Sequence, residues 1–547
     1  MFLADELKKV ISGDVLSDEV SLAEYSHDAS LFEVKPQVVV FPKDVDDLGK
    51  LIKFVGEKKK DMPGLSLTAR AAGTDMSGGP LTESIVVGFK KYFNKIKSVN
   101  AKQAVAEPGV FYRDFEKETL KYNALLPSYP ASRELCAMGG IVNNNSGGEK
   151  TLKYGKTENY VEALRVVLAD GNEYVFKALT EKELAEKLTL QTFEGQVYRK
   201  MDALIKNNEG LIESARPKVS KNSAGYYLWN IINKAKKTFD LSAVFVGAQG
   251  TLGFVTEATI RLVPIPKYAK MLVIFMDDLA PLGELTNKIL KYQPESFESY
   301  DDNTLKLALK YFASFAKLMG AKNVISTGWK FLPEFLMVLS GGIPKLVLQV
   351  EFTGDNEDEL AAIIDKLKAE LAPYKFRTRV AGSKEEAKKY WIIRRESFNL
   401  LRNRIKGKHT APFIDDVVVN PEKLPEFLPQ LNNILKEYHL TYTLAGHIGN
   451  GNFHIIPLMD FKNPVETSII PELSDKVYAL VLKFGGSITG EHNDGLIRSP
   501  YLKAMYGEAM YKLFEEVNRI FDPQDIFNPG KKVSSDKDFM VNHIRKD

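Results

Sequence analysis

The chain has 547 residues, 44% of them hydrophobic and 27% charged, and its formal net charge is +3. This length is too great for one hydrophobic core, so we expect two or three domains of an ordinary globular protein. The nearly balanced charge gives no indication of a nucleic-acid partner. The single cysteine, Cys136, excludes an internal disulfide and an iron–sulfur cluster held by this chain, and it favours a reducing, cytoplasmic location.

No transmembrane segment is expected. The chain does not begin with a basic and apolar leader, and no charge-free apolar run reaches the roughly 18 residues that a membrane-spanning helix needs. Segment 311–350 comes nearest, with large apolar residues between scattered lysines. It predicts core helices of a domain, and the alternative is a peripheral contact with the inner face of the membrane.

Residues 36–90 predict an alternating strand and helix unit. Val38–Phe41 is typical of a buried strand, 44–60 of a helix with an acidic start and a basic end, and Leu65–Thr68 of the start of a second strand. That strand leads into the small, turn-prone loop 70–79, whose backbone N–H groups could form a nest for a pyrophosphate or simply an ordinary tight turn. The glycine motifs of classical NAD sites and P-loops are absent.

Two further glycine-bearing regions follow, at 127–148 and 244–253. Asn and Gly accept left-handed backbone, so we expect these loops either to approach a ligand closely or to pack against their own domain. A helical insertion is predicted over 179–240, followed by a buried strand at Val244–Val246. Pro264-Ile265-Pro266 marks a domain boundary, beyond which strands and helices predict a second sheet covered by helices on one face.

The most informative histidines lie in 445–454. Asn450-Gly451 is a strong hairpin signal, because a type I′ turn requires positive φ at both central residues. With these two residues as the loop, His447 faces His454, and directly opposed Cβ atoms lie about 4.5–5.5 Å apart. Two imidazoles at that separation can bind one metal ion, and a carboxylate from elsewhere would leave positions open for a substrate.

Taken together, these segments resemble the FAD-linked oxidases typified by vanillyl-alcohol oxidase and p-cresol methylhydroxylase. Within that superfamily they are similar to the branch of D-lactate, glycolate and D-2-hydroxyglutarate dehydrogenases. The matching segments, in family order, are 25–30, 70–79, 130–132, 139–140, 154–155, 250–253, 446–454, 490–492 and 528–530.

The resemblance implies an α+β fold. A two-subdomain FAD-binding domain of the vanillyl-alcohol oxidase type is expected over 1–265, with subdomains at about 30–95 and 100–265. An α+β substrate or cap domain with an antiparallel sheet and the metal hairpin would follow over 266–470, and 471–547 would return to the flavin.

The resemblance also implies the site residues. His447, His454 and Glu491 would bind a divalent metal, zinc first and manganese or iron as alternatives, while His492 would be the base and Arg394 would bind the substrate carboxylate. Asp75-Met76 stand where covalent members often have histidine, so we expect non-covalent FAD. The cofactor-binding residues would be Arg70, Ala71, Ala72, Gly73, Thr74, Asp75, Ser77, Gly78, Pro130, Ser132, Gly139, Gly140, Asn143, Gly147, Tyr154, Gly250, Thr251, Gly253 and Asn528.

Two departures from the family pattern bear on the substrate. Asp494 would add an acid by the site, and Phe398 and Ile414 replace a threonine and a lysine that some D-2-hydroxyglutarate enzymes carry. This favours D-lactate as the 2-hydroxy acid, oxidised by hydride transfer to flavin N5. D-2-hydroxyglutarate and glycolate dehydrogenases, a flavoprotein subunit of a larger electron-transfer complex, and a zinc-binding protein without turnover are the alternatives. The electron acceptor would be quinone, cytochrome, oxygen or a separate iron–sulfur protein.

Overall fold

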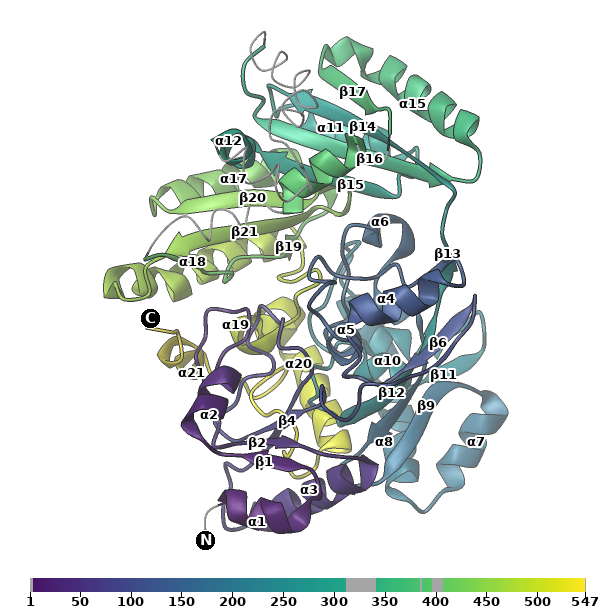
Figure 1. Ribbon diagram of the computed structural model, residues 1–547, viewed down its shortest axis with the longest axis vertical. Coiled ribbons are helices and arrows are strands. Elements are labelled where there is room, and N and C mark those ends of the chain that lie inside the picture. Colours follow the sequence, from purple (N-terminus) through teal and green to yellow (C-terminus); the bar gives the residue numbers. More distant parts are fainter. Residues whose placement is uncertain (1–2, 311–340, 384–385, 396–406, 547) are drawn as a thin grey trace.

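The computed structural model describes residues 3–310, 341–383, 386–395 and 407–546 (Figure 1). Two sheets lie in the N-terminal half and a third lies between residues 268 and 459. Most of the segment 311–350, and also Phe398, lie outside the described residues. Among the helices that are described, none is long and apolar enough to span a bilayer.

The first sheet has the order β1-β2-β4-β3. Its strands are β1 (Asp14–Leu16), β2 (Val38–Phe41), β3 (Leu67–Arg70) and β4 (Ile85–Gly88). β4 pairs in parallel with both β2 and β3, and the crossover between β2 and β3 is helix α3 (Val45–Lys58). The carboxylate of Asp44 caps α3 by accepting the backbone N–H of Asp47. The predicted strand–helix–strand unit is therefore confirmed.

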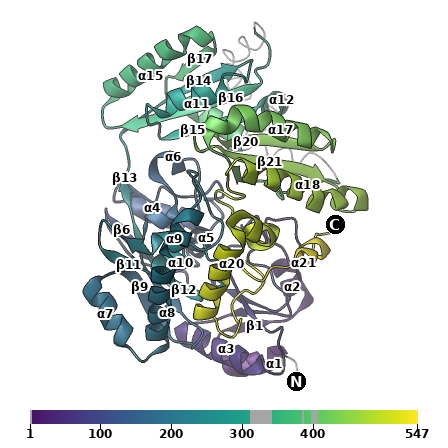
Figure 2. The same ribbon diagram turned by 180° about the vertical axis from the view of Figure 1, so that it is seen from behind.

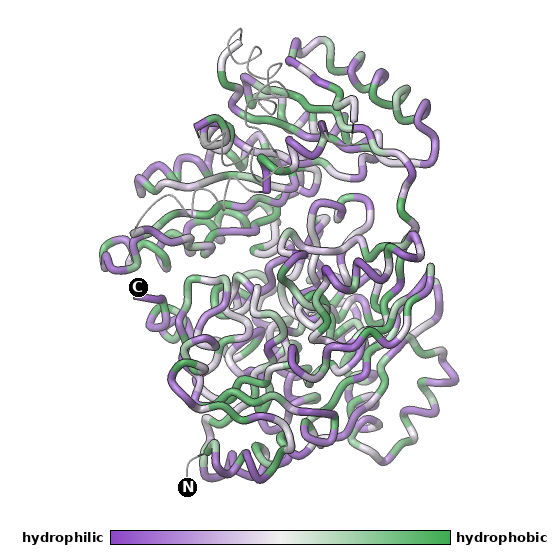
Figure 3. The backbone as a smooth tube through the Cα atoms, viewed as in Figure 1, coloured by the Kyte–Doolittle hydropathy of each residue, from purple (hydrophilic) through white to green (hydrophobic). Residues whose placement is uncertain are grey.

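The second sheet is antiparallel, with the order β10-β11-β9-β8-β12-β6-β5. Its strands are β5 (Ile96–Val99), β6 (Gln103–Ala106), β8 (Val161–Val167), β9 (Glu173–Thr180), β10 (Ile232–Asn233), β11 (Thr238–Asp240) and β12 (Phe254–Arg261). A small pair, β7 (Ala124–Leu125) and β13 (Val263–Pro264), lies beside it. Most apolar side chains of β8 and β12 are buried, and Figure 3 shows hydrophobic (green) stretches of backbone in this part of the molecule.

Several short helices surround these two sheets. They are α1 (Leu3–Val10), α2 (Glu19–Tyr25), α4 (Tyr112–Leu120), α5 (Met138–Asn144), α6 (Thr151–Tyr154), α7 (Glu181–Thr189), α8 (Phe193–Asn207), α9 (Glu209–Ala215) and α10 (Ser242–Phe245). Two predictions were wrong here. The segment 244–246 is the end of helix α10 and a following extended residue, because a short apolar run fits a buried helix as well as a strand. The insertion 179–240 is helical only to Ala215, and then adds β10 and β11 to the sheet edge.

The third sheet forms the upper body in Figure 1 and is antiparallel, with the order β17-β14-β16-β15-β20-β21-β18 and β19 on β21. Its strands are β14 (Tyr268–Met276), β15 (Ser296–Asp301), β16 (Leu346–Gly354), β17 (Arg377–Ala381), β18 (His409–Thr410), β19 (Val417–Val418), β20 (Thr441–His447) and β21 (Asn452–Met459). The helices around it are α11 (Leu282–Leu290), α12 (Asp302–Lys310), α15 (Glu357–Leu371), α17 (Leu424–Lys436) and α18 (Pro464–Lys483).

The C-terminal segment returns to the N-terminal half and carries α19 (Gly495–Arg498), α20 (Leu502–Phe521) and α21 (Lys537–Asn542). From behind, α20 runs beside α8 and α9 (Figure 2). Past α20, Asn528 donates to the carbonyls of Gly79 and Gln249, and its backbone N–H donates to Leu67. These bonds hold the C-terminal segment at Asn528 against β3 and against two loops that face the third sheet.

Candidate active site

A cavity of about 610 Å³ lies between the loops of the two N-terminal sheets and the third sheet. Three chain segments line one wall, 71–80, 129–149 and 249–255. The opposite wall consists of Arg394, Ala445, His447, His454 and Ile456, and Glu491 and His492 contribute from the C-terminal segment. Its volume is within the range of about 300–1,000 Å³ that is usual for ligand and cofactor pockets.

The first wall, here called the loop wall, consists largely of backbone and small side chains. Gly73 has φ +73°, and a Cβ there would lie 2.5 Å from the Arg70 guanidinium, so only glycine fits this turn. Gly140 lies in α5, yet an added Cβ would meet no atom within 4 Å because the residue faces the cavity. A wall that leaves this space and exposes backbone N–H groups fits an elongated, phosphate-bearing cofactor such as FAD.

Most of the predicted cofactor residues lie in the loop wall. They are Ala71, Ala72, Gly73, Thr74, Asp75, Pro130, Ser132, Gly139, Gly140, Asn143, Gly147, Gly250 and Gly253. Six others lie behind it, namely Arg70, Ser77, Gly78, Tyr154, Thr251 and Asn528. Arg70 donates to the carbonyls of Tyr25 and His27, and the Tyr154 hydroxyl donates to Glu295, so these side chains are turned away from the cavity.

The predicted register of the histidine hairpin was wrong. His447 is opposite Asn452, and Ala445 is opposite His454. The loop contains four residues, a helical turn over Ile448–Asn450 followed by Gly451 at φ +65°, instead of a two-residue turn. Tertiary contacts hold this longer loop, because Asn450 bonds to Ser220 through its side chain and its carbonyl.

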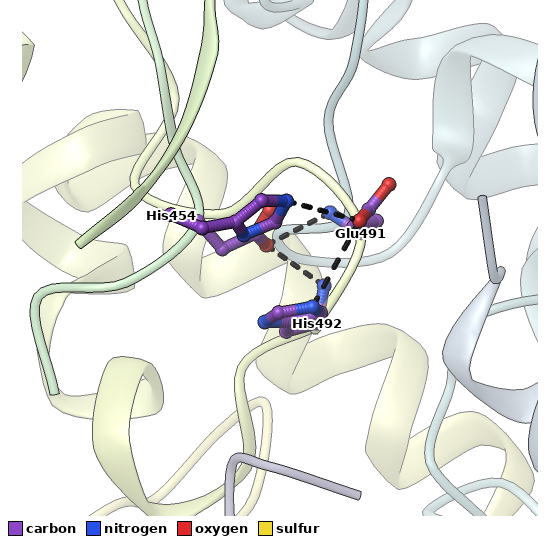
Figure 4. A group of neighbouring side chains, drawn as sticks. His454, Glu491 and His492 are labelled. Carbon is purple, nitrogen blue, oxygen red and sulfur yellow. Dashed lines mark hydrogen bonds and ion pairs between the residues drawn. The ribbon is translucent and has the colours of Figure 1, made fainter. Parts of the chain in front are cut away.

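The shifted register still brings the two histidines together. A slip of two residues keeps His447 and His454 on one face of the sheet as diagonal neighbours, and their ring centroids are 5.3 Å apart. His492 stacks against His454 with a centroid distance of 5.1 Å, and Figure 4 shows both rings beside Glu491. The three histidines therefore meet at one point although two come from a sheet and one from a distant loop.

All three imidazoles point their Nε2 atoms at one carboxylate oxygen. Glu491 Oε1 lies 3.1 Å from His447 Nε2, 3.4 Å from His454 Nε2 and 3.9 Å from His492 Nε2. The other oxygen of Glu491 accepts the ammonium of the fully buried Lys221 at 2.8 Å. Nitrogen and oxygen donors of this kind suit a divalent metal such as zinc, so the residues present fit a cation at this point.

Asp416 lies close to the same group but is committed elsewhere. His454, Glu491, His492 and Asp416 offer ligand atoms that lie within 4.8 Å of one another. However, Asp416 Oδ2 accepts the backbone N–H groups of residues 490–492 and the hydroxyl of Thr489. This carboxylate therefore shapes the loop that carries Glu491, whereas His447 Nε2 contacts Glu491 directly.

Buried carboxylates hold the outer nitrogens of the histidines. His447 Nδ1 lies 2.7 Å from Glu298 Oε1, and His454 Nδ1 lies 3.0 Å from Asp415 Oδ1. Glu298 also forms an ion pair with Arg394, whose Nη2 is 3.4 Å from His447 Nδ1. Arg394, which was expected to bind substrate, is thus tied to His447 through Glu298.

The electrostatics of the cluster favour bound positive charge. Burial alone would raise the pKa of Glu491, but Lys221 and His447 hold that pKa well below its usual range. Burial would lower the pKa of His454, whereas Asp415 and Glu491 raise it to about 10. A divalent cation bound here would displace the protons that these rings otherwise keep.

Four of the charged residues in this cluster were not predicted from the sequence: Lys221, Glu298, Asp415 and Asp416. An acid inside the buried strand β15 and an acidic pair before the buried Val417–Val418 are signals that could have indicated buried carboxylates. Lys221 has no such local signal. Asp494, expected beside the site, instead pairs with the fully buried Lys532 at 2.7 Å and accepts Gly225 N–H. Ile414 is fully buried and is not in the cavity wall.

The chain is similar to flavoproteins over most of its length. The family described as FAD binding domain matches residues 36–176, and the family described as FAD linked oxidases, C-terminal domain, matches residues 265–532. Among solved structures, p-cresol methylhydroxylase with substrate bound aligns with a TM-score of 0.68 at 16% identity, covering 97% of this chain and 96% of that one. At 16% identity, this similarity is evidence for a shared fold alone.

Three relatives are named as enzymes that act on 2-hydroxy acids. A D-2-hydroxyglutarate dehydrogenase of Pseudomonas putida is 29% identical over 95% of this chain, which spans only 50% of that protein. A D-lactate dehydrogenase of Anaerostipes hadrus is 26% identical, covering 96% of this chain and 94% of the relative. A glycolate oxidase subunit of Bacillus subtilis is 26% identical, with 94% and 92% covered. With its FAD binding domain followed by the C-terminal domain of that family around this cavity, the chain belongs to the FAD linked oxidases.

Proposed function

We propose that this chain is an FAD-dependent dehydrogenase that oxidises a D-2-hydroxy acid to the 2-oxo acid, with D-lactate as our first choice of substrate. The observation that carries the proposal is the convergence of three imidazole Nε2 atoms on Glu491 in the cavity that the loop wall also lines. The names of the relatives support the same reaction class.

Oxidation of a 2-hydroxy acid removes the hydroxyl proton and a hydride from Cα. His492 Nε2 faces the cavity and would accept the proton, and Arg394 would bind the substrate carboxylate with its planar guanidinium. Bound FAD would supply the hydride acceptor. The loop wall would hold this cofactor without a covalent bond, because Asp75 and Met76 stand at the cavity where a histidine attachment would be needed.

His447, His454 and Glu491 would hold a divalent ion, for which zinc is our first choice and manganese or iron are alternatives. The Nε2 atoms of His447 and His454 lie closer to Glu491 Oε1 than His492 Nε2 does, at 3.1 and 3.4 Å against 3.9 Å, which favours His492 as the base. A cation would lower the pKa of the substrate hydroxyl and orient the acid. Its charge would also oppose the effect of Asp416 and Asp415, which raise the pKa of His492 against the lowering effect of burial.

The charges of the cavity support a small monocarboxylate. Beside His454 the wall presents Ala445 and Ile456. The arginines among the described lining residues are Arg394 and Arg395, and Arg395 is paired with Glu149 at 3.0 Å. A substrate carboxylate at Arg394 would share that guanidinium with Glu298, and a second carboxylate would have to displace Glu149 from Arg395. This argument covers the described lining residues alone, since 396–406 lie outside them.

A flavoprotein part of a larger electron-transfer protein is the second candidate function. It is favoured by one observation, that the chain spans half the length of four curated D-2-hydroxyglutarate dehydrogenases. In this version D-2-hydroxyglutarate or glycolate would be the substrate. Quinone, a cytochrome or a separate iron–sulfur protein would take the electrons, because Cys136 is the only cysteine in the chain.

The test is a screen of purified, FAD-reconstituted protein with metal analysis. D- and L-lactate, glycolate and D-2-hydroxyglutarate would be supplied with an artificial dye, a quinone and a cytochrome as acceptors. We expect bound yellow FAD, bound zinc and oxidation of D-lactate in preference to the other acids. Protein that takes up no FAD, or that binds FAD and oxidises none of these acids with any acceptor, would contradict the proposal.

A further inference from the structure

Asp415 lies between a metal-site histidine and the expected base. Its Oδ1 is 3.0 Å from His454 Nδ1, and its Oδ2 is 2.8 Å from His492 Nδ1. The carboxylate is fully buried, and the two imidazoles stack at an interplanar angle of 23° (Figure 4). One carboxylate thus serves two rings whose inner nitrogens face the cavity.

Asp415 Oδ2 and His492 Nδ1 lie 2.8 Å apart as an ion pair, and neither atom forms a hydrogen bond with any described residue. The backbone carbonyl of Asp415 accepts the guanidinium of the buried Arg498, which fixes the chain at this point. The next residue, Asp416, holds the loop of His492 by accepting its backbone N–H. The position of the carboxylate between the two rings is therefore fixed from both sides.

An ionised carboxylate can only accept hydrogen bonds, so once a cation at Glu491 has displaced the Nε2 protons, each ring must keep its single proton on Nδ1, beside Asp415. We propose that Asp415 is a positioning residue that keeps His454 and His492 in the same tautomer, so that both Nε2 lone pairs face Glu491 and the cavity. His454 can then bind a cation while His492 accepts a proton. The catalytic half of this inference rests on the proposed function, whereas the tautomers rest on the proposed cation alone.

Asparagine at this position separates the two roles. Its amide has one oxygen that accepts and one nitrogen that donates, so it can keep only one of the two rings protonated on Nδ1. Bound zinc selects the correct tautomer of His454, because a ligating Nε2 must be free of its proton. The second ring must then accept the amide N–H at Nδ1 and carry its proton on Nε2, where it can no longer act as a base.

The experiment compares D415N with the wild-type protein, both loaded with FAD and zinc. We expect D415N to keep its zinc content, its flavin absorbance and a KM close to the wild-type value, while kcat falls by about 10²–10⁴-fold, as for loss of a general base. D415A should additionally bind zinc about 10–100-fold more weakly, because it leaves His454 without its outer partner. Wild-type kcat in D415N, or a low kcat that excess zinc restores, would overturn the proposal.

A second measurement needs neither turnover nor a variant at Asp415. In zinc-loaded wild-type protein with ¹⁵N-labelled histidine, the ring signals are assigned by their loss in H454Q and H492Q and followed with pH until each ring has one proton. We expect that proton on Nδ1 of both rings. A proton on Nε2 of either ring would overturn the inference, even if the screen identifies the substrate. Nδ1 protons on both rings would support it even if no hydroxy acid is oxidised.

Discussion

The two walls of the cavity are built in opposite ways. The loop wall consists largely of backbone and small side chains from three continuous segments; it has no room for a Cβ at Gly73 and leaves open space beside Gly140. The opposite wall, here called the metal wall after the proposed cation, carries ionisable side chains from separate elements, with buried partners such as Glu298 and Asp415. Substitution should therefore harm the first wall by adding atoms and the second by removing a charge.

The largest expected effect is a loss of turnover when His492, the proposed base, is replaced. His492→Ala should lower kcat by about 10²–10⁴-fold while zinc and FAD stay bound, because Glu491, His447 and His454 remain. His447→Ala should instead lose zinc, since that ring is 3.1 Å from Glu491. Steady-state kinetics with metal analysis separate the two. Zinc loss in His492→Ala would make His492 a ligand and not the base.

Glu298→Gln tests whether the outer partners of the metal wall matter. Glutamine can still accept from His447 Nδ1 but turns an uncharged amide toward Arg394, so zinc affinity should fall by about 10–100-fold. The matched control is Glu295→Gln, a buried acid near the same strand that pairs with Lys150 and does not line the cavity. Competition with a zinc chelator measures the difference. Equal zinc affinity in the two variants would show that Glu298 does not support the metal site.

The loop wall could be predicted from the sequence more fully than the metal wall. Glycine and asparagine in 71–79 and 139–147 encode local backbone bends, and most of the residues named there do line the cavity. The prediction of the hairpin register was wrong because Ser220, far away in sequence, bonds to Asn450 and holds a four-residue loop. Lys221, Glu298 and Asp415 reach the site from three separate parts of the chain. No local sequence pattern predicts that a buried charged residue in one segment will contact a histidine in another.

A smaller effect is expected in the loop wall, from Gly140→Ala. Alanine in a helix is favoured over glycine by about 0.5–1 kcal/mol, so the protein without FAD should become slightly more stable. The same methyl group points into space that FAD would fill, so flavin binding should weaken. Gly210→Ala is the control, because Gly210 is also exposed in a helix with no atom within 4 Å of an added Cβ, but lies away from the cavity.

Thermal unfolding with and without FAD, together with flavin titration, measures both effects of Gly140→Ala. Gly210→Ala should show the stabilisation alone. Unchanged flavin affinity in Gly140→Ala would mean that FAD does not approach α5, and the assignment of the loop wall as the cofactor side would be wrong.

The smallest effect on turnover is expected from Asp522→Asn, a substitution outside the cavity lining. This carboxylate accepts the backbone N–H groups of Ile526 and Phe527, and Ile526 in turn accepts the N–H of Leu67. Burial raises the pKa of Asp522 to about 6, against the lowering effect of these two N–H groups. The folded protein therefore binds a proton more tightly here than the unfolded chain, whose aspartate titrates near 3.9.

This difference gives the sign of the pH dependence. The contribution of Asp522 to stability is fully present below about pH 4 and is lost as the pH rises through about 6. Asp522→Asn cannot titrate, so its stability relative to the wild type should increase over that interval, while kcat at neutral pH stays the same. Asp61→Asn, at an exposed position, controls for the loss of one carboxylate. Denaturant unfolding at several pH values measures the difference, and a constant gap between Asp522→Asn and the wild type from pH 4 to 7 would contradict the assignment.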